Sequence, residues 1–307
     1  MKKIMMIAVL LVAGISTYAQ KTNLALNLTQ GNTYYMTTTT KMLISEVING
    51  NKQDVTTTIS AKIAHKILAV ADTTYEMEIR YQRIDMKVES GGQSVDFNSD
   101  GKEKSMFANL MASIVNKPFT ITLNKRGKVR SIKNIENLYS TMFDSIPNLS
   151  EGQKAQAKNQ MQQAFGAENF KGNIESAFAV FPPTKVAKSD KWAVVTNMEM
   201  MVPAQETFAY VLQDVTDNAY QIHGDGVIQL APGADFKEMN GVPMKFINLA
   251  GTSTAELKLD KKTGWIAEAK ISKQIKGSVQ VKDNPKVPGG MTFPITATGE
   301  TSIAGNE

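Results

Sequence analysis

The chain has 307 residues, a size that suits one large or two modest domains with a real apolar core. Hydrophobic residues make up 42% and charged residues 21%, a balance typical of a globular protein and unlike a disordered one. The formal net charge of +5 is too mild to indicate a nucleic-acid partner or a polybasic membrane patch. With no cysteine, the chain can form neither disulfides nor a lipid-modified N-terminal cysteine, so core burial must supply its stability.

The first 19 residues predict a secretory signal peptide. Lys2 and Lys3 precede the apolar run 4–15, and Ala19 provides a small residue for cleavage before Gln20. This run is too short to span a membrane, which takes about 20 apolar residues. We therefore expect a mature protein that begins near Gln20 and is exported to the periplasm or the exterior. Because the sequence has no second long apolar run, we expect no stable insertion in a membrane.

Residues 20–132 are typical of a β segment with one helix. Apolar and polar residues alternate with period two through 33–47 and 55–69, which indicates strands with one buried face. Asn49 and Gly50 between these strands tolerate positive φ and predict a tight hairpin.

The next predicted strand, 75–88, loses its alternation once. Tyr81 and Ile84 are both apolar although they are three residues apart, so strict alternation would bury Arg83 beside Tyr81. A β-bulge at Gln82-Arg83 returns both apolar residues to one face. Because bulges let long strands bend, this slip also predicts a curved sheet.

Two stretches favour amphipathic helices, separated by a predicted hairpin of 119–123 and 129–132. The first is 103–115, whose apolar face includes Met106 and Met111. The second opens a helical middle, 133–180, with apolar residues at helical spacing: Ile135, Leu138, Tyr139, Met142, Phe143 and Ile146.

Two further helices are expected in the same region. Ser150 with Gln153 resembles a capping box that opens a third helix, and a short fourth helix is expected over 173–178. Strands then resume in a C-terminal β segment, 181–307. Its predicted strands are 192–196, 208–215, 220–230, 246–259, 265–281 and 291–303.

These elements predict an α+β fold. Its core is one or two long, curved antiparallel sheets, open like a half-barrel, with the helices packed upon them. The chain divides into the signal peptide (1–19), the N-terminal β segment (20–132), the helical middle (133–180) and the C-terminal β segment (181–307). We expect the two β segments to form one compact unit, and whether they share one sheet or build two stays open at this point.

Of the two histidines, His65 falls on the apolar face of its strand. Such a ring can orient a head group inside a ligand cavity, but an interior histidine bonded to backbone or water is the commoner interpretation. His223 lies on a polar face. Neither histidine stands at metal-ligand spacing from carboxylates, so no cofactor is expected.

Enzyme motifs are weak in this sequence. It has no Gly-x-Ser-x-Gly elbow, cysteine nucleophile or glycine-rich phosphate loop. Residues 96–101 superficially resemble a calcium loop, but its twelfth position, Phe107, lacks the bidentate carboxylate, so a solvated hairpin tip is favoured. Because carboxylates lie mostly on polar faces, a glycoside hydrolase with paired carboxylates is a distant alternative, and we expect no enzyme.

Two other features bear on sites. The triplets around Thr73 and Ser145 resemble periplasmic O-glycosylation motifs of Bacteroidota, although a turn and a helix residue explain them as well. Methionines on the apolar helix faces suit an adaptable surface for an apolar ligand, although methionine also fills gaps in ordinary cores. The predicted ligand-lining residues are His65, Met106, Met111, Leu138, Tyr139, Met142 and Phe143.

Several short motifs are spread over nearly the whole mature chain: Gly31-x-x-Tyr34, Leu123-x-x-x-Gly127-x-Val129, Phe181-Pro182-Pro183, Ser189-Asp190-Lys191-Trp192 and Leu259-Asp260-x-x-Thr263-Gly264. Together with the signal, they resemble an uncharacterised family of exported Bacteroidota proteins, a domain of unknown function. These motifs are structural and name no catalytic residue. In architecture, long curved strands with helices between them resemble the open half-barrels of periplasmic lipid and lipoprotein carriers.

The function expected from these observations is non-catalytic binding of an apolar or amphipathic, lipid-like ligand between the curved sheet and the helices. The alternative is a structural or protein-interaction module of the cell envelope whose interior is filled by side chains.

Overall fold

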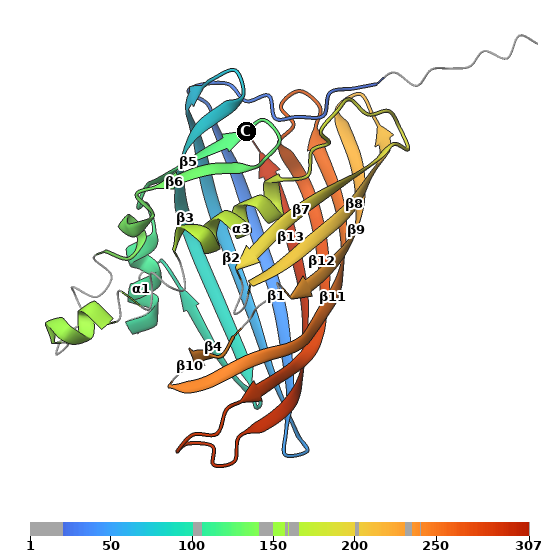
Figure 1. Cartoon of the computed structure of the whole chain (residues 1–307). Coiled ribbons are helices and arrows are strands. Elements are labelled where there is room, and N and C mark those ends of the chain that lie inside the picture. The colour runs from blue at the N-terminus through green and yellow to red at the C-terminus, as the bar shows by residue number, and fades with distance from the viewer. Residues whose placement is uncertain are drawn as a thin grey trace, which may run out of the picture.

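The computed structural model describes residues 21–100, 106–140, 150–156, 159, 166–199, 203–230, 235–239 and 241–306. Within these ranges, thirteen strands form one antiparallel sheet that curves strongly around its own inner face and stays open (Figure 1). The prediction of long, curved antiparallel strands in a half-barrel-like arrangement is confirmed. Met142, Phe143 and Ser145 lie outside the described residues.

The centre of the sheet joins the two ends of the chain. Strand β1 (Thr33–Ile48) pairs on one side with β2 (Asn51–Val70) and on the other with β13 (Met291–Asn306). The N-terminal and C-terminal β segments therefore share one sheet, which the sequence left open.

From β1, the N-terminal half of the sheet continues through β2 and β3 to its edge. Its further strands are β3 (Thr74–Ser90), β5 (Phe119–Asn124) and β6 (Val129–Lys133), with β4 (Gln93–Asn98) paired to β3. The other half runs from β13 to β12 (Ile266–Val281), β11 (Val242–Asp260), β9 (Ala219–Leu230), β8 (Pro203–Val215) and β7 (Lys191–Glu199), with β10 (Lys237–Met239) paired to β11.

The local predictions for the first strands are confirmed. Asn49 and Gly50 form the β1–β2 turn with φ of 51° and 79°. Lys62 pairs with Arg83 but Ile63 pairs with Tyr81, so Gln82 is the extra residue of a bulge in β3. As a result, Ile84 is buried while Arg83 points to solvent and forms an ion pair with Asp85.

The start of the helical middle differs from its predicted α-helix. Over the described residues 135–140, a single 3₁₀ turn, η1 (Ile135–Leu138), follows Asn134, whose φ of 60° is left-handed. The Asn137 side chain donates to the Pro118 carbonyl at 3.0 Å, which ties this turn to the start of β5. The rest of the predicted helix beyond residue 140 lies outside the described residues.

The other helices follow the sequence more closely. Helix α1 is Met106–Ile114, within the predicted 103–115. Ser150 and Gln153 form the predicted capping box, since each backbone N–H donates to the other's side chain, and residues 151–156 are helical. Helix α3 (Ala167–Phe178) ends where the helix expected over 173–178 ends, but it begins six residues earlier.

One end of the half-barrel, drawn at the top of Figure 1, is closed by the N-terminal segment. Leu24, Leu26 and Leu28 are buried there in the main apolar core. The Leu26 N–H donates to the carbonyl of Lys125 and the Asn27 N–H donates to that of Thr263, at 2.8 and 2.7 Å. The segment thereby ties the two halves of the sheet together.

Helix α3 completes this closed end by lying inside the curve of the sheet and bridging its two edge strands, β6 and β7 (Figure 1). The buried Glu175 carboxylate accepts the Val129 N–H at 2.9 Å and pairs with Lys128 at 3.0 Å. Lys128 also donates to the Val195 carbonyl of β7 at 2.6 Å, so one side chain links both edges. Gly127 is required beside it, because a Cβ there would lie 1.7 Å from the Phe178 carbonyl oxygen.

Candidate ligand-binding face

The inner face of the sheet is defined by the side chains that point toward α3. On β1 these begin with the buried Tyr34 and Met36, and alternation carries the same face on to Thr38, Thr40 and Met42. Because directly paired residues of antiparallel strands point to the same side, the register extends this inner face across the whole sheet.

Near the closed end, the inner face is filled by packed side chains. His65 is buried there, with its ring centroid 5.1 Å from that of Trp265 and 5.7 Å from that of Phe178. Among the described residues its Nδ1 atom has no hydrogen-bond partner. Burial lowers the pKa of His65 to about 4, against smaller opposing effects of the Tyr34 and Ile63 backbone.

The structure separates the other predicted lining residues. Leu138 and Tyr139 are buried in the same main core as His65. Met111 lies half-buried on α1, which Met106 begins, and α1 lies against β3 and β4. These positions do not converge on one described cavity, and their role as ligand contacts stays a prediction.

Farther from the closed end, the inner face keeps apolar side chains partly exposed. We call this part, on β1–β4, the open face. Its Ile59 is 41% exposed and Val95 is 50% exposed, whereas Ile67, on the same face of β2 at the closed end, is 1% exposed. Its residues are Met42, Thr57, Ile59, Met86, Val88 and Val95.

The open face was not identified from the sequence as a site. The alternation that predicted its strands gives Ile59 and His65 the same face, but it does not say which of them is covered. Whether an inner-face residue is covered depends on the positions of α3, the N-terminal segment and a second apolar cluster. That cluster lies on the inner face of β11–β13 and packs against Ile44 and Ile48 of β1.

A charged pair lies on the inner face of the other half of the sheet, on β8 and β12. Glu206 of β8 is 1% exposed, and one of its oxygens lies 2.7 Å from Lys273 Nζ of β12. Its other oxygen, Oε1, accepts a hydrogen bond from the Ser253 hydroxyl, with an oxygen–oxygen distance of 2.7 Å. Gly226 makes room for this contact, because a Cβ there would lie 2.0 Å from Ser253 Oγ.

The sequence carries a signal for this pair, a single charged residue in phase with apolar neighbours on each strand. Lys273 stands in phase with Ile271 and Ile275, and Glu206 stands in phase with Ala204 and Phe208. One charge therefore interrupts each apolar face, although the strands concerned are far apart in the sequence.

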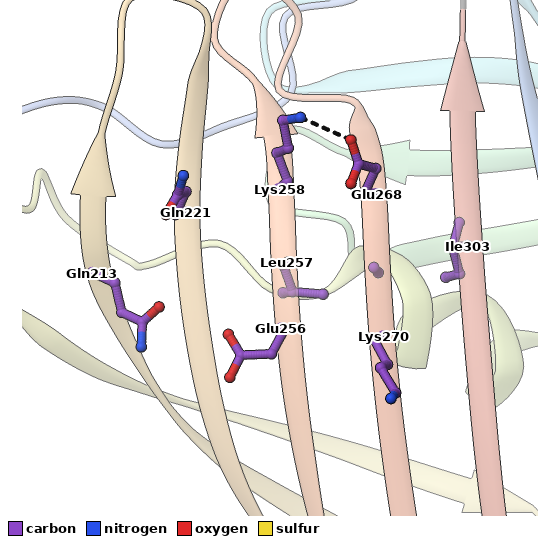
Figure 2. Close-up of a pocket in the computed structure, with 9 residues that line it drawn as sticks. Gln213, Gln221, Glu256, Leu257, Lys258, Glu268, Lys270 and Ile303 are labelled. Carbon is purple, nitrogen blue, oxygen red and sulfur yellow. Dashed lines mark hydrogen bonds and ion pairs between the residues drawn. The ribbon is translucent and has the colours of Figure 1, made fainter.

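The outer face is different in character. A hollow of about 380 Å³ there has charged and amide side chains around it, among them Gln221, Glu256 and Lys270, and the Lys258–Glu268 ion pair of 2.8 Å (Figure 2). Beside it, a hydrogen bond of 2.6 Å to Glu256 raises the pKa of His223. Such a surface suits water better than an apolar ligand.

Another hollow of about 380 Å³ lies where α3 meets the sheet edges. Lys128, Arg130 and Lys171 line it together with Glu175 and Asn197. Because the Lys128–Glu175 contact within it also holds the two edges together, this hollow belongs to the closure of the fold.

Several remaining sequence predictions can be placed. Asp96 lies within strand β4 and not in a hairpin tip, which is formed by Gly91 and Gly92 with φ of 58° and 78°. The expectation of a solvated tip over 96–101 is therefore wrong for Asp96, because residues 93–98 pair with β3. Thr73 lies exposed in the turn between β2 and β3.

The described residues contain neither a metal-ligand group nor a membrane-spanning helix. No group of three or more His, Cys, Asp or Glu residues among them is arranged to hold a metal ion. None of their helices is both long enough and apolar enough to cross a membrane.

Comparison with known proteins places the chain in a family. Residues 72–266 match the family of unknown function DUF6263. The chain belongs to this family. The match spans the bulged strand β3, α3 and most of the C-terminal strands, so it covers both halves of the sheet. Comparison with the curated proteins finds no match.

Solved structures show a similar architecture. A structure that reports lipid–protein interactions in lipovitellin matches with a TM-score of 0.52 and 10% identity over 92% of this chain. The chain spans about a quarter of the length of that protein, 26%. An outer-membrane channel from Pseudomonas putida F1 matches with a TM-score of only 0.25 and 7% identity, over 92% of this chain and 97% of the channel. The lipovitellin likeness supports the expected architecture of a long, curved and open antiparallel sheet.

Proposed function

We propose that this member of DUF6263 is an exported, non-catalytic protein that binds a lipid-like apolar or amphipathic ligand on the open face. The observation that carries this proposal is the change in exposure along one face of one strand. On β2, Ile67 at the closed end is 1% exposed and Ile59 on the open face is 41% exposed. On β2, the inner face is thus part of the core at one end and partly exposed farther along the strand.

Apolar residues gathered on an exposed concave surface favour a partner that covers them. Each methylene group that leaves water for such a surface contributes about 0.8 kcal/mol, so an acyl chain laid along it gains substantial free energy. Single exposed apolar residues need no explanation, but a contiguous group marks an interaction surface. The similarity in fold to lipovitellin, whose structure describes lipid–protein interactions, supports a lipid-like ligand.

The test measures binding of a fluorescent fatty acid to purified protein, with native mass spectrometry of the gently purified protein to detect a co-purifying lipid. Val95→Asp and Ile59→Asp place a charge on the open face and are expected to weaken binding by about tenfold or more. Val227→Asp is the matched control, because Val227 is 51% exposed on the outer face of β9, against 50% for Val95.

Two outcomes would count against ligand binding on this face. One is no fatty-acid binding and no co-purified lipid with the wild type, which would favour the envelope structural or protein-interaction module. The other is an equal loss of binding in Val95→Asp and Val227→Asp, which would place the ligand elsewhere.

Export is supported by the basic start, the apolar run and the small residue at position 19. N-terminal sequencing of the protein from cell fractions is expected to find Gln20 or Lys21 first. A membrane-bound species that retains Met1 would contradict export by signal cleavage.

A further inference from the structure

The Glu206–Lys273 pair places a buried carboxylate and a partly buried ammonium among apolar side chains. Removing charges from water costs free energy, and the attraction between partners often only offsets that cost. A pair of apolar side chains would fill the same place with less desolvation. The Glu206 carboxylate is nevertheless fixed by two hydrogen bonds, because Ser253 and Lys273 each donate to one of its oxygens at 2.7 Å.

Lys273 lies on β12, which β13 separates from the open face on β1. Its neighbour in the next strand is Gly299 of β13, which is paired with Met42 of β1. A Cβ added to Gly299 would have no atom within 4 Å, so the space above this residue is open. The Lys273 side chain is 25% exposed whereas that of Glu206 is 1% exposed, so Lys273 is the more accessible residue of the pair.

The row of paired residues that contains Lys273 leads across β13 and β1 onto apolar surface, on the side of β12 away from Glu206. From Lys273 it crosses Gly299, Met42 and Thr57 and reaches Val88 of β3. Strands lie about 4.8 Å apart, so these four steps span about 19 Å, a distance that an extended long acyl chain can cover. Ile59 and Met86 lie in the adjacent row.

From this arrangement we propose that Lys273 binds the anionic head group of an amphipathic ligand whose acyl chain lies across the open face. Glu206 is a positioning residue that fixes the ammonium and is itself fixed by Ser253. A carboxylate or phosphate head group forms a charge-assisted hydrogen bond with Lys273, which is stronger than a neutral one. This inference rests on the proposed function and adds the chemical class of the head group.

The test compares oleate with oleyl alcohol, which has the same chain and an uncharged head group. Wild-type protein is expected to bind oleate about tenfold more tightly than oleyl alcohol. Lys273→Met is expected to remove this preference while the affinity for oleyl alcohol stays within about twofold. Lysophosphatidate, measured in parallel, tells whether a phosphate is preferred over a carboxylate.

Two further variants keep the result interpretable. Lys273→Met alone leaves Glu206 buried without its cation, so the double variant Glu206→Gln with Lys273→Met removes both charges together. Lys276→Met, on the exposed outer face of the same strand, is the control and should keep the wild-type preference.

Equal binding of oleate and oleyl alcohol by the wild type would overturn the head-group assignment but leave ligand binding intact. Retention of the oleate preference in the double variant would also overturn the head-group assignment and leave ligand binding intact. Failure of both ligands to bind the wild type would instead overturn the proposed function itself.

Discussion

The two ends of the sheet use the same strands and the same face for different purposes. Met77 and Met86 both lie on the inner face of β3, yet Met77 is fully buried and Met86 is partly exposed. At the closed end, the N-terminal segment and α3 cover the inner face and link both edges of the sheet. The comparison teaches that a period-two apolar pattern fixes which face turns inward but not whether that face becomes a core or a surface.

The largest expected difference between the ends is in stability. Met77→Ala should lower the free energy of unfolding by about 2–5 kcal/mol, because it opens a cavity in a packed core. Met86→Ala on the open face should cost clearly less and should mainly weaken binding of an apolar ligand. Urea denaturation of both variants, with fatty-acid binding as a second readout, measures this. Equal losses of stability would show that the two ends are packed alike.

The closed end should also be sensitive to acid through His65. Its pKa in the folded protein is about 4, below the ordinary 6.5, so the unfolded chain takes up a proton first as pH falls. The stabilisation that comes from keeping His65 neutral is therefore complete above pH 6.5 and is lost as pH falls from there toward 4. The expected contribution is about 3 kcal/mol, from 1.36 kcal/mol for each unit of pKa shift.

Denaturation of wild type and His65→Leu at pH 7.5 and pH 4 separates this effect from the titration of carboxylates. The variant should lose less stability than the wild type over this interval. His223 acts in the opposite direction, because its raised pKa favours the protonated folded form and its contribution is lost as pH rises. An unchanged pH dependence in His65→Leu would mean that the ring is not desolvated.

A smaller effect is expected where α3 joins the two edges. Glu175→Ala leaves the buried Val129 N–H without its acceptor and should cost about 1–3 kcal/mol. Glu175→Gln keeps an acceptor and should cost less. Glu151→Ala, at a highly exposed carboxylate, is the control and should leave the denaturation midpoint unchanged. Similar midpoints for Glu175→Ala and the control would show that this contact does not hold the closed end.

Much of the local structure could be predicted because short-range chemistry decides it. Asn49-Gly50 forms a hairpin since both residues accept positive φ, and the change of phase around Gln82 could only be a bulge if Tyr81 and Ile84 were both to be buried. The Ser150–Gln153 capping box is likewise a contact within one helical turn. The helix expected over 135–146 was wrong at its start, where the backbone of Asn134 is left-handed and the Asn137 side chain bonds the Pro118 carbonyl, and a single 3₁₀ turn forms instead.

The candidate site was harder to predict because it depends on contacts between distant segments. His65, Leu138 and Tyr139 are buried, but apolar periodicity cannot separate a core position from a ligand-facing one. Lys273 and Glu206 each interrupt an apolar pattern in the sequence, but they stand 67 residues apart on strands that β9 and β11 separate, and they meet only in the curved sheet.

By itself, then, the sequence determined the long strands, the β1–β2 turn, the bulge and the inward face of these strands, since propensity and alternation act over a few residues. Only the tertiary structure decided that β1 pairs with β13 to make one sheet, that α3 and the N-terminal segment cover one end, and that a charged pair joins β8 and β12 on the inner face. These features arise from the curvature and closure of the whole sheet. Closure brings together residues whose sequence separation hides their relation.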